Sequence, residues 1–137
     1  MIFAGNPGSA KTSVAKLFSK IAKEEGVFKC GAFVECGGMD LDGLGCKYDI
    51  REAFIAAKGG VLFIDEAYSL KSDSAITVLL QEMDNHRDEV IVILAGYSER
   101  MKAFMKKNEG VKSRIPYWID FPDYSVNELI DIFKLMI

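Results

Sequence analysis

The chain has 137 residues, of which 50% are hydrophobic and 27% are charged, and its formal net charge is −3 at pH 7. A chain of this length and composition can build one hydrophobic core, so we expect one main domain. The acidic balance offers no basic surface for nucleic acid, and no apolar run approaches the roughly 20 residues of a membrane-spanning helix. We therefore expect protein or small-molecule partners, with no nucleic acid and no membrane.

The three cysteines, Cys30, Cys36 and Cys46, are odd in number, and their spacing matches no usual zinc pattern. Cys36 falls within an apolar run that is typical of a strand. The chain begins directly on an apolar run without the pattern of a signal peptide. These features favour reduced, buried or incidental thiols and a cytoplasmic location.

Strand-like and helix-like patterns alternate along the first half of the chain. Residues 1–5 form a short apolar run that ends in glycine, and residues 13–25 place apolar residues at helical spacing. Residues 32–36 predict a second strand. Residues 49–60 predict a helix that begins at Asp49 as its N-cap residue.

The second half of the chain continues this alternation. Its predicted strands cover residues 60–67, 90–96 and 117–121, and its predicted helices lie around residues 76–83, at 98–110 and from 125 onward. The continuous apolar strands indicate burial on both faces of a sheet. The order of elements therefore predicts an α/β fold, in which helices cover both faces of a parallel sheet.

The final predicted helix has a capping box formed by Ser125 and Glu128, and the chain stops within it. We therefore expect these 137 residues to be part of a longer protein. A segment before the first strand and a region after the last helix would complete it.

The stretch "GNPGSAKT" at residues 5–12 lies between the first strand and the first helix. A glycine-rich turn in this context aims backbone N–H groups inward, and the helix N-terminus adds partial positive charge, so it suits a polyphosphate. Lys11 is expected to neutralise the β and γ phosphates, and the Thr12 hydroxyl to hold Mg²⁺. Ala10 stands where this loop normally has glycine, and its Cβ can crowd the phosphate.

A pair of acids ends the apolar strand in "VLFIDEA". Asp65 is expected to hold the hydration shell of Mg²⁺, and Glu66 to orient and polarise a water molecule for attack on the γ phosphate. Two adjacent acids can also merely cap the next helix, but together with a phosphate loop they favour a hydrolytic site. The Asn-Lys-x-Asp motif by which GTPases read the base is absent.

Four motifs together resemble the AAA+ ATPases of the group that contains red-type Rubisco activase, stage V sporulation protein K and the type VII secretion ATPase. They are "GNPGSAKT", "VLFIDEAYSL", "VIVILAGYSERM" and "VKSRIPYWIDFPDY", and the similarity runs along essentially the whole chain. The resemblance implies a P-loop NTPase with a five-stranded sheet in the order 5-1-4-3-2. It also implies ATP and Mg²⁺ as ligands, a homo-oligomer that is normally hexameric, and an unknown protein substrate.

The resemblance also divides the chain and extends the site. Residues 1–124 would be the core of the large nucleotide-binding domain, and residues 125–137 the first helix leading into a lid. Alanine before the lysine occurs in some members of the group, so the resemblance implies that Ala10 is tolerated. The residues expected to bind the nucleotide are Gly5, Asn6, Pro7, Gly8, Ser9, Ala10, Lys11, Thr12 and Ser13.

Two further site residues rest on the resemblance. Tyr97, at the end of the fourth strand, aligns with a polar sensor of the γ phosphate, although an aromatic residue there is as often a packing residue. Arg114, in a predicted loop, matches the arginine finger that reaches the nucleotide of the neighbouring subunit. The group often has a second arginine two residues earlier, where this chain has Lys112.

The segments that form pore loops in the group are short here. "DLDGLGCKYDIREAF" contains Tyr48 as its only aromatic residue before Phe54, and the segment after "DEAYSL" is also abbreviated. Either the pore loops are short or residues are absent from this sequence. His86 lies at a polar helix end, where we expect it to be solvated.

Three functions are compatible with these residues. The first is the ATP-hydrolysing motor of a protein-remodelling ring, which Glu66 and Arg114 favour. The second is a nucleotide-dependent regulatory module, which the short pore loops favour. The third is a phosphoryl-transfer enzyme, which has less need of a water-activating glutamate.

Overall fold

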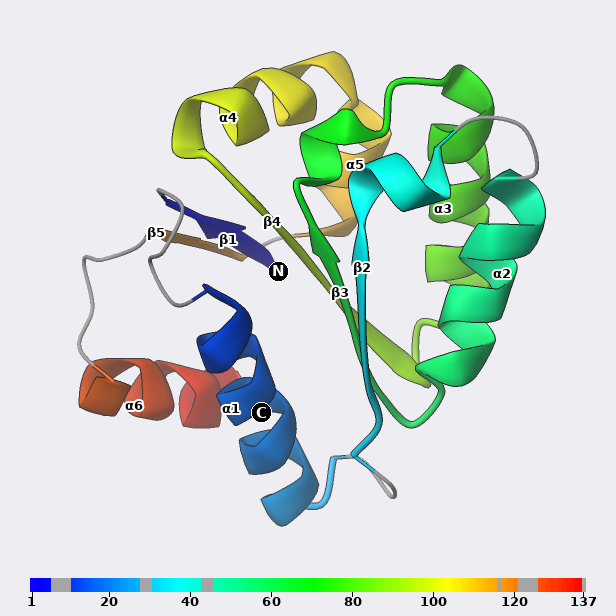
Figure 1. Cartoon of the computed structure of the whole chain (residues 1–137). Helices are drawn as coiled ribbons and strands as arrows, with labels where there is room; N and C mark the ends of the chain where they lie inside the picture. The colour runs from blue at the N-terminus through cyan, green and yellow to red at the C-terminus, as the bar shows by residue number, and fades with distance from the viewer. Residues whose placement is uncertain (6–10, 28–30, 43–45, 116, 121–125, 137) are drawn as a thin grey trace.

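The computed structural model describes residues 1–5, 11–27, 31–42, 46–115, 117–120 and 126–136. Its centre is a sheet of five parallel strands in the order β2-β3-β4-β1-β5 (Figure 1). Read from the other end, this is the order 5-1-4-3-2, so the expected fold is confirmed. The strands are β1 (Ile2–Ala4), β2 (Phe33–Gly37), β3 (Gly60–Asp65), β4 (Val90–Gly96) and β5 (Trp118–Asp120).

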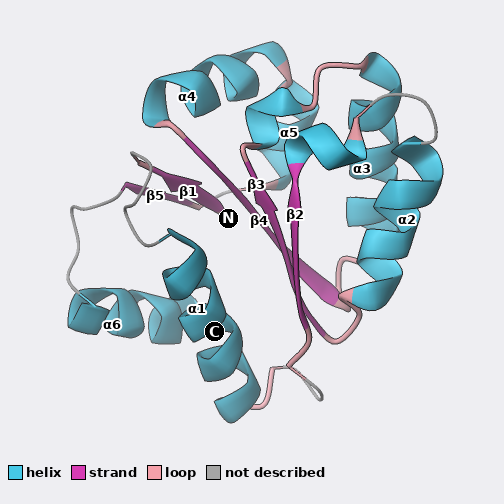
Figure 2. Ribbon diagram, viewed as in Figure 1, coloured by secondary structure: helices cyan, strands magenta, loops and turns pink. Residues whose placement is uncertain are grey.

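Helices cover both faces of the sheet (Figure 2). One face carries α1 (Lys11–Glu24) and α6 (Val126–Met136), and the other carries α2 (Cys46–Ala56), α3 (Asp73–Asn85), α4 (Ser98–Lys107) and α5 (Glu109–Arg114). Two short 3-10 helices, η1 (Gly38–Leu41) and η2 (Ala67–Ser69), follow β2 and β3. In the described part of the chain, no helix has the length and apolar character needed to cross a membrane.

The alternation of side chains along the strands builds two separate cores. Along β3, Phe63 packs in the core beneath α1, whereas Leu62 and Ile64 pack in the core beneath α2 to α5. All three are fully buried. Phe133 of α6 joins the first core, where its ring lies 4.9 Å from that of Phe18 between centroids. The continuous apolar strands are therefore buried on both faces, as the sequence predicts.

The helix predicted from Asp49 begins one turn earlier, at Cys46. Asp49 is not its N-cap residue but an acid in its first turn, where a carboxylate still interacts favourably with the helix dipole. The apolar periodicity starts only at Ile50, which is fully buried, so the extra turn carries no periodic pattern that marks its start.

The helix predicted over residues 98–110 is interrupted. Asn108 has φ −120° and ψ 72°, and it separates α4 from α5. Its side-chain amide donates a hydrogen bond of 2.9 Å to the carbonyl of Phe104, which also accepts a 3.0 Å hydrogen bond from the backbone N–H of Asn108. As a result, Arg114 ends the short helix α5 and does not lie in a loop as predicted.

The prediction that His86 is solvated is wrong. Its side chain is only 18% exposed, it accepts or donates a 3.0 Å hydrogen bond with Glu82, and its ring stacks on that of Phe54 at 5.6 Å. Glu82 is itself buried and also forms an ion pair of 3.2 Å with Arg51 of α2. His86 thus belongs to a polar contact that joins α2 to the end of α3.

Candidate functional site

The candidate site lies where β1, β3 and β4 end, at Ala4, Asp65 and Gly96; we call this the carboxyl edge of the sheet. Ligands of open α/β sheets bind at this edge. The N–H of Gly5 donates a 3.0 Å hydrogen bond to the carbonyl of Gly96, which holds the start of the loop against β4. The loop residues Asn6, Pro7, Gly8, Ser9 and Ala10 lie outside the described residues.

Lys11 opens helix α1 and folds back over the start of this loop. Its Nζ donates a 3.1 Å hydrogen bond to the carbonyl of Gly5. Partial burial lowers the pKa of Lys11, and the negative charge of Asp65 acts in the opposite direction. An ammonium that has lost part of its hydration interacts strongly with an incoming anion, so Lys11 can bind a phosphate group here.

Thr12 and Asp65 supply oxygen atoms on the same face of the sheet. Asp65 follows Phe63 by two residues along β3, which places its side chain on the α1 side. Its Oδ1 accepts a 3.0 Å hydrogen bond from the N–H of Glu66. Hydroxyl and carboxylate oxygens are the ligands that Mg²⁺ prefers, so these two residues could hold a magnesium ion together with phosphate oxygens.

Within the described residues, no group of three or more His, Cys, Asp or Glu side chains is placed to hold a metal by itself. Ser13, the last of the predicted binding residues, is an exposed residue in the first turn of α1.

Glu66 occupies a strained position directly after β3. Its φ of 49° and ψ of 48° lie in the left-handed region, and among the described residues it is the one non-glycine with positive φ. Strain of this kind is concentrated at functional sites. Gly38 of η1 packs against it so closely that a Cβ there would lie 2.5 Å from the carbonyl oxygen of Glu66. The side chain of Glu66 remains exposed at the carboxyl edge.

Tyr97 lies at the same edge, in a cluster that sequence reasoning missed. It is the N-cap residue of α4, and its ring centroid is 6.4 Å from that of Tyr68 in η2. The guanidinium of Arg100 lies 5.2 Å from the Tyr68 ring and 5.3 Å from the Tyr97 ring. Tyr97 and Arg100 are three residues apart at the start of one helix, and this spacing predicts that their side chains are neighbours. No local pattern predicts the contact with Tyr68, because α3 and β4 lie between Tyr68 and these two residues in the sequence.

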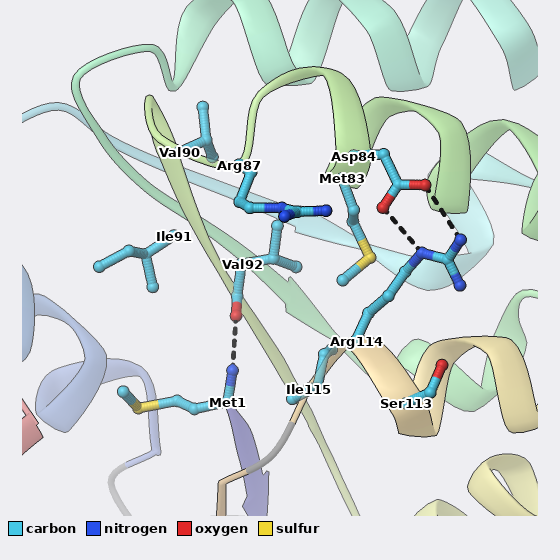
Figure 3. A pocket seen from close by; sticks show the side chains of 10 residues that line it. All are labelled: Met1, Met83, Asp84, Arg87, Val90, Ile91, Val92, Ser113, Arg114 and Ile115. Carbon is cyan, nitrogen blue, oxygen red and sulfur yellow. Dashed lines mark hydrogen bonds and ion pairs between the residues drawn. The ribbon is translucent and has the colours of Figure 1, made fainter.

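Arg114 lies at the opposite end of the sheet, where β1, β3 and β4 begin at Ile2, Gly60 and Val90; we call this the amino edge. It lines a pocket of about 450 Å³ there together with Val90 and Val92 (Figure 3). Gly60 pairs with Val90, and Asp65 is five residues further along β3, so the two edges are about 16 Å apart at roughly 3.3 Å per residue. The structure therefore does not bring Arg114 to the other predicted site residues of its own chain.

Asp84 of α3 holds Arg114 through two hydrogen bonds (Figure 3). Nε and Nη2 of the guanidinium donate to the two carboxylate oxygens at 2.9 and 3.0 Å. These hydrogen bonds lower the pKa of Asp84 and raise the pKa of Arg114. The Arg114 side chain is 34% exposed and the Asp84 side chain is 42% exposed, so a ligand in solution can reach the guanidinium.

Comparison with known proteins identifies relatives along the whole chain. The model of the ATPase family associated with various cellular activities (AAA) matches residues 1–121. Stage V sporulation protein K of Bacillus subtilis is 44% identical over 100% of this chain and 46% of its own length. Protein CbbX of Cereibacter sphaeroides is 43% identical over 96% of this chain and 46% of its own length. The chain thus spans about half the length of these relatives.

Solved structures agree with the fold. The RuvB Holliday junction branch migration motor of Thermotoga maritima superposes with a TM-score of 0.63 at 24% identity, over 98% of this chain and 43% of that chain. Its T158V variant gives a TM-score of 0.66 at 23% identity. The resemblance to the group that contains stage V sporulation protein K is confirmed by the relatives above. On the match of the family model and these relatives, the chain belongs to the AAA family of ATPases.

Proposed function

We propose that this chain binds and hydrolyses ATP with Mg²⁺, as the motor domain of a protein-remodelling ring. One observation carries the proposal. Lys11 interacts electrostatically with Asp65 at the carboxyl edge, Thr12 follows Lys11 in the first turn of α1, and Glu66 follows Asp65 in a left-handed conformation. This is the set of groups that hydrolysis of a nucleoside triphosphate requires.

Each residue has a role that follows from its chemistry. Gly5 to Ser13 would surround the phosphates, and the Lys11 ammonium would bind the β and γ phosphates. Thr12 and Asp65 would hold Mg²⁺, which supplies charge neutralisation between the phosphates when bound. Glu66 would accept a proton from the attacking water, since its carboxylate is exposed beside this group.

Arg114 is proposed to act on the nucleotide of a neighbouring copy. The distance between the two edges of one sheet rules out a contact with its own site, as the separation of about 16 Å exceeds the reach of one side chain. An exposed guanidinium can instead stabilise charge on a γ phosphate that an adjacent subunit presents. An arginine that acts in this way requires a neighbouring subunit. We propose that the subunits form a homo-hexameric ring that acts on an unidentified protein.

The remaining assignments extend this proposal. Tyr97 is kept as a candidate sensor of the γ phosphate because it lies at the carboxyl edge, although its ring contacts Arg100 and Tyr68. Residues 1–124 are proposed as the core of the large domain, and residues 125–137 as the first helix leading into a lid. The cytoplasmic location stays a prediction from the cysteines.

Glu66→Gln tests the proposed reaction. The amide keeps the shape of the side chain but cannot take a proton, so hydrolysis should fall by about 10²- to 10⁴-fold while ATP affinity is retained. Phosphate release measures the rate, and a fluorescent ATP derivative measures binding. Glu99→Gln, at an exposed glutamate of α4, is the control and should hydrolyse normally. Hydrolysis by Glu66→Gln at the wild-type rate would overturn the assignment.

A further inference from the structure

Glu35 of β2 contacts Thr12, one of the two candidate ligands of magnesium, and it was not among the site residues predicted from the sequence. Its carboxylate Oε2 accepts a 3.3 Å hydrogen bond from the hydroxyl of Thr12, which is 23 residues earlier in the chain. Glu35 interrupts an otherwise apolar strand, "AFVEC", with an ionisable side chain. The side chain of Glu35 is exposed on the edge strand of the sheet, so its carboxylate carries no burial cost there.

The register of the sheet shows why this contact is possible. Glu35 pairs with Phe63, and Gly37 pairs with Asp65, so Glu35 and Asp65 lie on adjacent strands and on the same face. Two residues along the strand and one strand across correspond to about 8 Å between backbones. This is the face that α1 covers, and the first turn of α1 places Thr12 over it.

The hydrogen bond determines how the Thr12 hydroxyl can act as a ligand. A hydroxyl has one proton and two lone pairs, and it can rotate freely when nothing holds it. When its proton points to Glu35, its lone pairs are directed elsewhere and remain available to a cation. Residues behind a metal ligand that orient it in this way typically change metal affinity by about 10- to 100-fold.

We propose that Glu35 is a positioning residue, which accepts the Thr12 proton and so directs the hydroxyl oxygen toward the Mg²⁺ of a bound nucleotide. This inference rests on the proposed function and deepens it. Glu35 does not contact the nucleotide or the metal in this proposal. Its effect is transmitted through the Thr12 hydroxyl alone, which makes the coupling between the two residues measurable.

The experiment measures how far Mg²⁺ strengthens nucleotide binding. A fluorescent N-methylanthraniloyl derivative of ATP is titrated with excess MgCl₂ and again with EDTA, and the ratio of the two affinities is the magnesium enhancement. Glu35→Ala should reduce this enhancement about 10-fold. It should leave the affinity in EDTA unchanged or slightly higher, because a negative charge has been removed. Glu35→Gln keeps an oxygen that can accept the Thr12 proton, so it should retain most of the enhancement.

A double-mutant cycle separates positioning from a general charge effect. Thr12→Val removes the hydroxyl at nearly constant shape, so Glu35→Ala should have no further effect on the enhancement in that background. Glu24→Ala removes an exposed acid from the far end of α1 and serves as the control, with thermal unfolding as the check that each variant folds.

The outcomes distinguish this inference from the proposed function. If Lys11→Ala leaves binding in MgCl₂ unchanged, the nucleotide site itself is wrongly assigned. If Lys11→Ala strongly weakens binding but Glu35→Ala keeps the full magnesium enhancement, the role of Glu35 is refuted. Additive effects of Glu35→Ala and Thr12→Val would refute it as well, because two independent contributions would then be at work.

Discussion

The carboxyl edge and the amino edge of the sheet hold their charged side chains differently. At the carboxyl edge, the charge of Asp65 raises the pKa of Lys11 against the larger effect of burial, and the Lys11 ammonium donates a hydrogen bond to the backbone carbonyl of Gly5. At the amino edge, Arg114 is engaged by both oxygens of one carboxylate. The two edges therefore differ in the groups that contact their cations: a backbone carbonyl contacts Lys11, and a side-chain carboxylate contacts Arg114.

The amino edge itself contains two kinds of ion pair. The Glu82 carboxylate is buried between Arg51 and His86 and joins α2 to α3. The pair of Asp84 and Arg114, two residues further along α3, is exposed. Burial therefore distinguishes a contact that is expected to stabilise the fold from an exposed contact that contributes little to stability.

The largest expected effect tests whether the amino edge serves another subunit. Under conditions in which the chain assembles, Arg114→Ala should reduce hydrolysis by about 10³-fold or more and leave ATP affinity nearly unchanged, since a finger acts mainly in the transition state. Phosphate release and nucleotide binding are measured in parallel. Lys112→Ala, at the exposed lysine two residues earlier, is the matched control.

Mixed assemblies show directly whether Arg114 acts between copies. Subunits with Arg114→Ala keep their own nucleotide site, and subunits with Glu66→Gln keep their finger. Mixing the two should recover part of the hydrolysis at shared interfaces. Demonstrated mixed oligomers that remain inactive would contradict a finger that acts in trans.

The second prediction concerns the cation at the carboxyl edge. Lys11→Ala should weaken binding of Mg²⁺-ATP on the order of 100-fold, because a charge-assisted contact to phosphate is lost. The fold should be retained, since Lys11 is only partly buried and lies at the first position of α1. Lys20→Ala, at an exposed position of the same helix, should bind normally. Equal affinities for the two variants would show that the carboxyl edge is not the nucleotide site.

The third prediction concerns the buried pair of the amino edge. Glu82→Ala should lower the free energy of unfolding by about 1–3 kcal/mol, because Arg51 and His86 lose a buried hydrogen-bond partner. Urea unfolding measures the change, and Asp88→Ala at a nearby exposed position is the control. A loss no larger than that of the control would mean that this contact does not stabilise the fold.

The smallest effect is expected for the exposed pair. Arg114 lowers the pKa of Asp84, so the ion pair contributes above the ordinary carboxyl pKa and is lost as the pH falls through the lowered value. Asp84→Asn should therefore be slightly less stable than wild type at neutral pH, and the difference should shrink in acid. Thermal unfolding at several pH values measures it. A difference that does not vary with pH would indicate a role other than the charge of Asp84.

The order of strands and helices was predictable from the sequence, because the periodic spacing of apolar residues, every two residues in strands and about every 3.6 in helices, needs no knowledge of tertiary contacts. The sequence also located Lys11, Thr12, Asp65 and Glu66, since these chemical groups lie in short contiguous motifs next to predicted strands. The strand order within the sheet and the roles of Tyr97 and Arg114 came from family resemblance.

Contacts between residues that are far apart in the sequence could be identified only in the folded chain. Glu35 reaches Thr12 because of the register between β2 and β3, and His86 is buried because Phe54 of another helix stacks on it. Each of these depends on the direction of side chains from separate elements, which local periodicity does not encode.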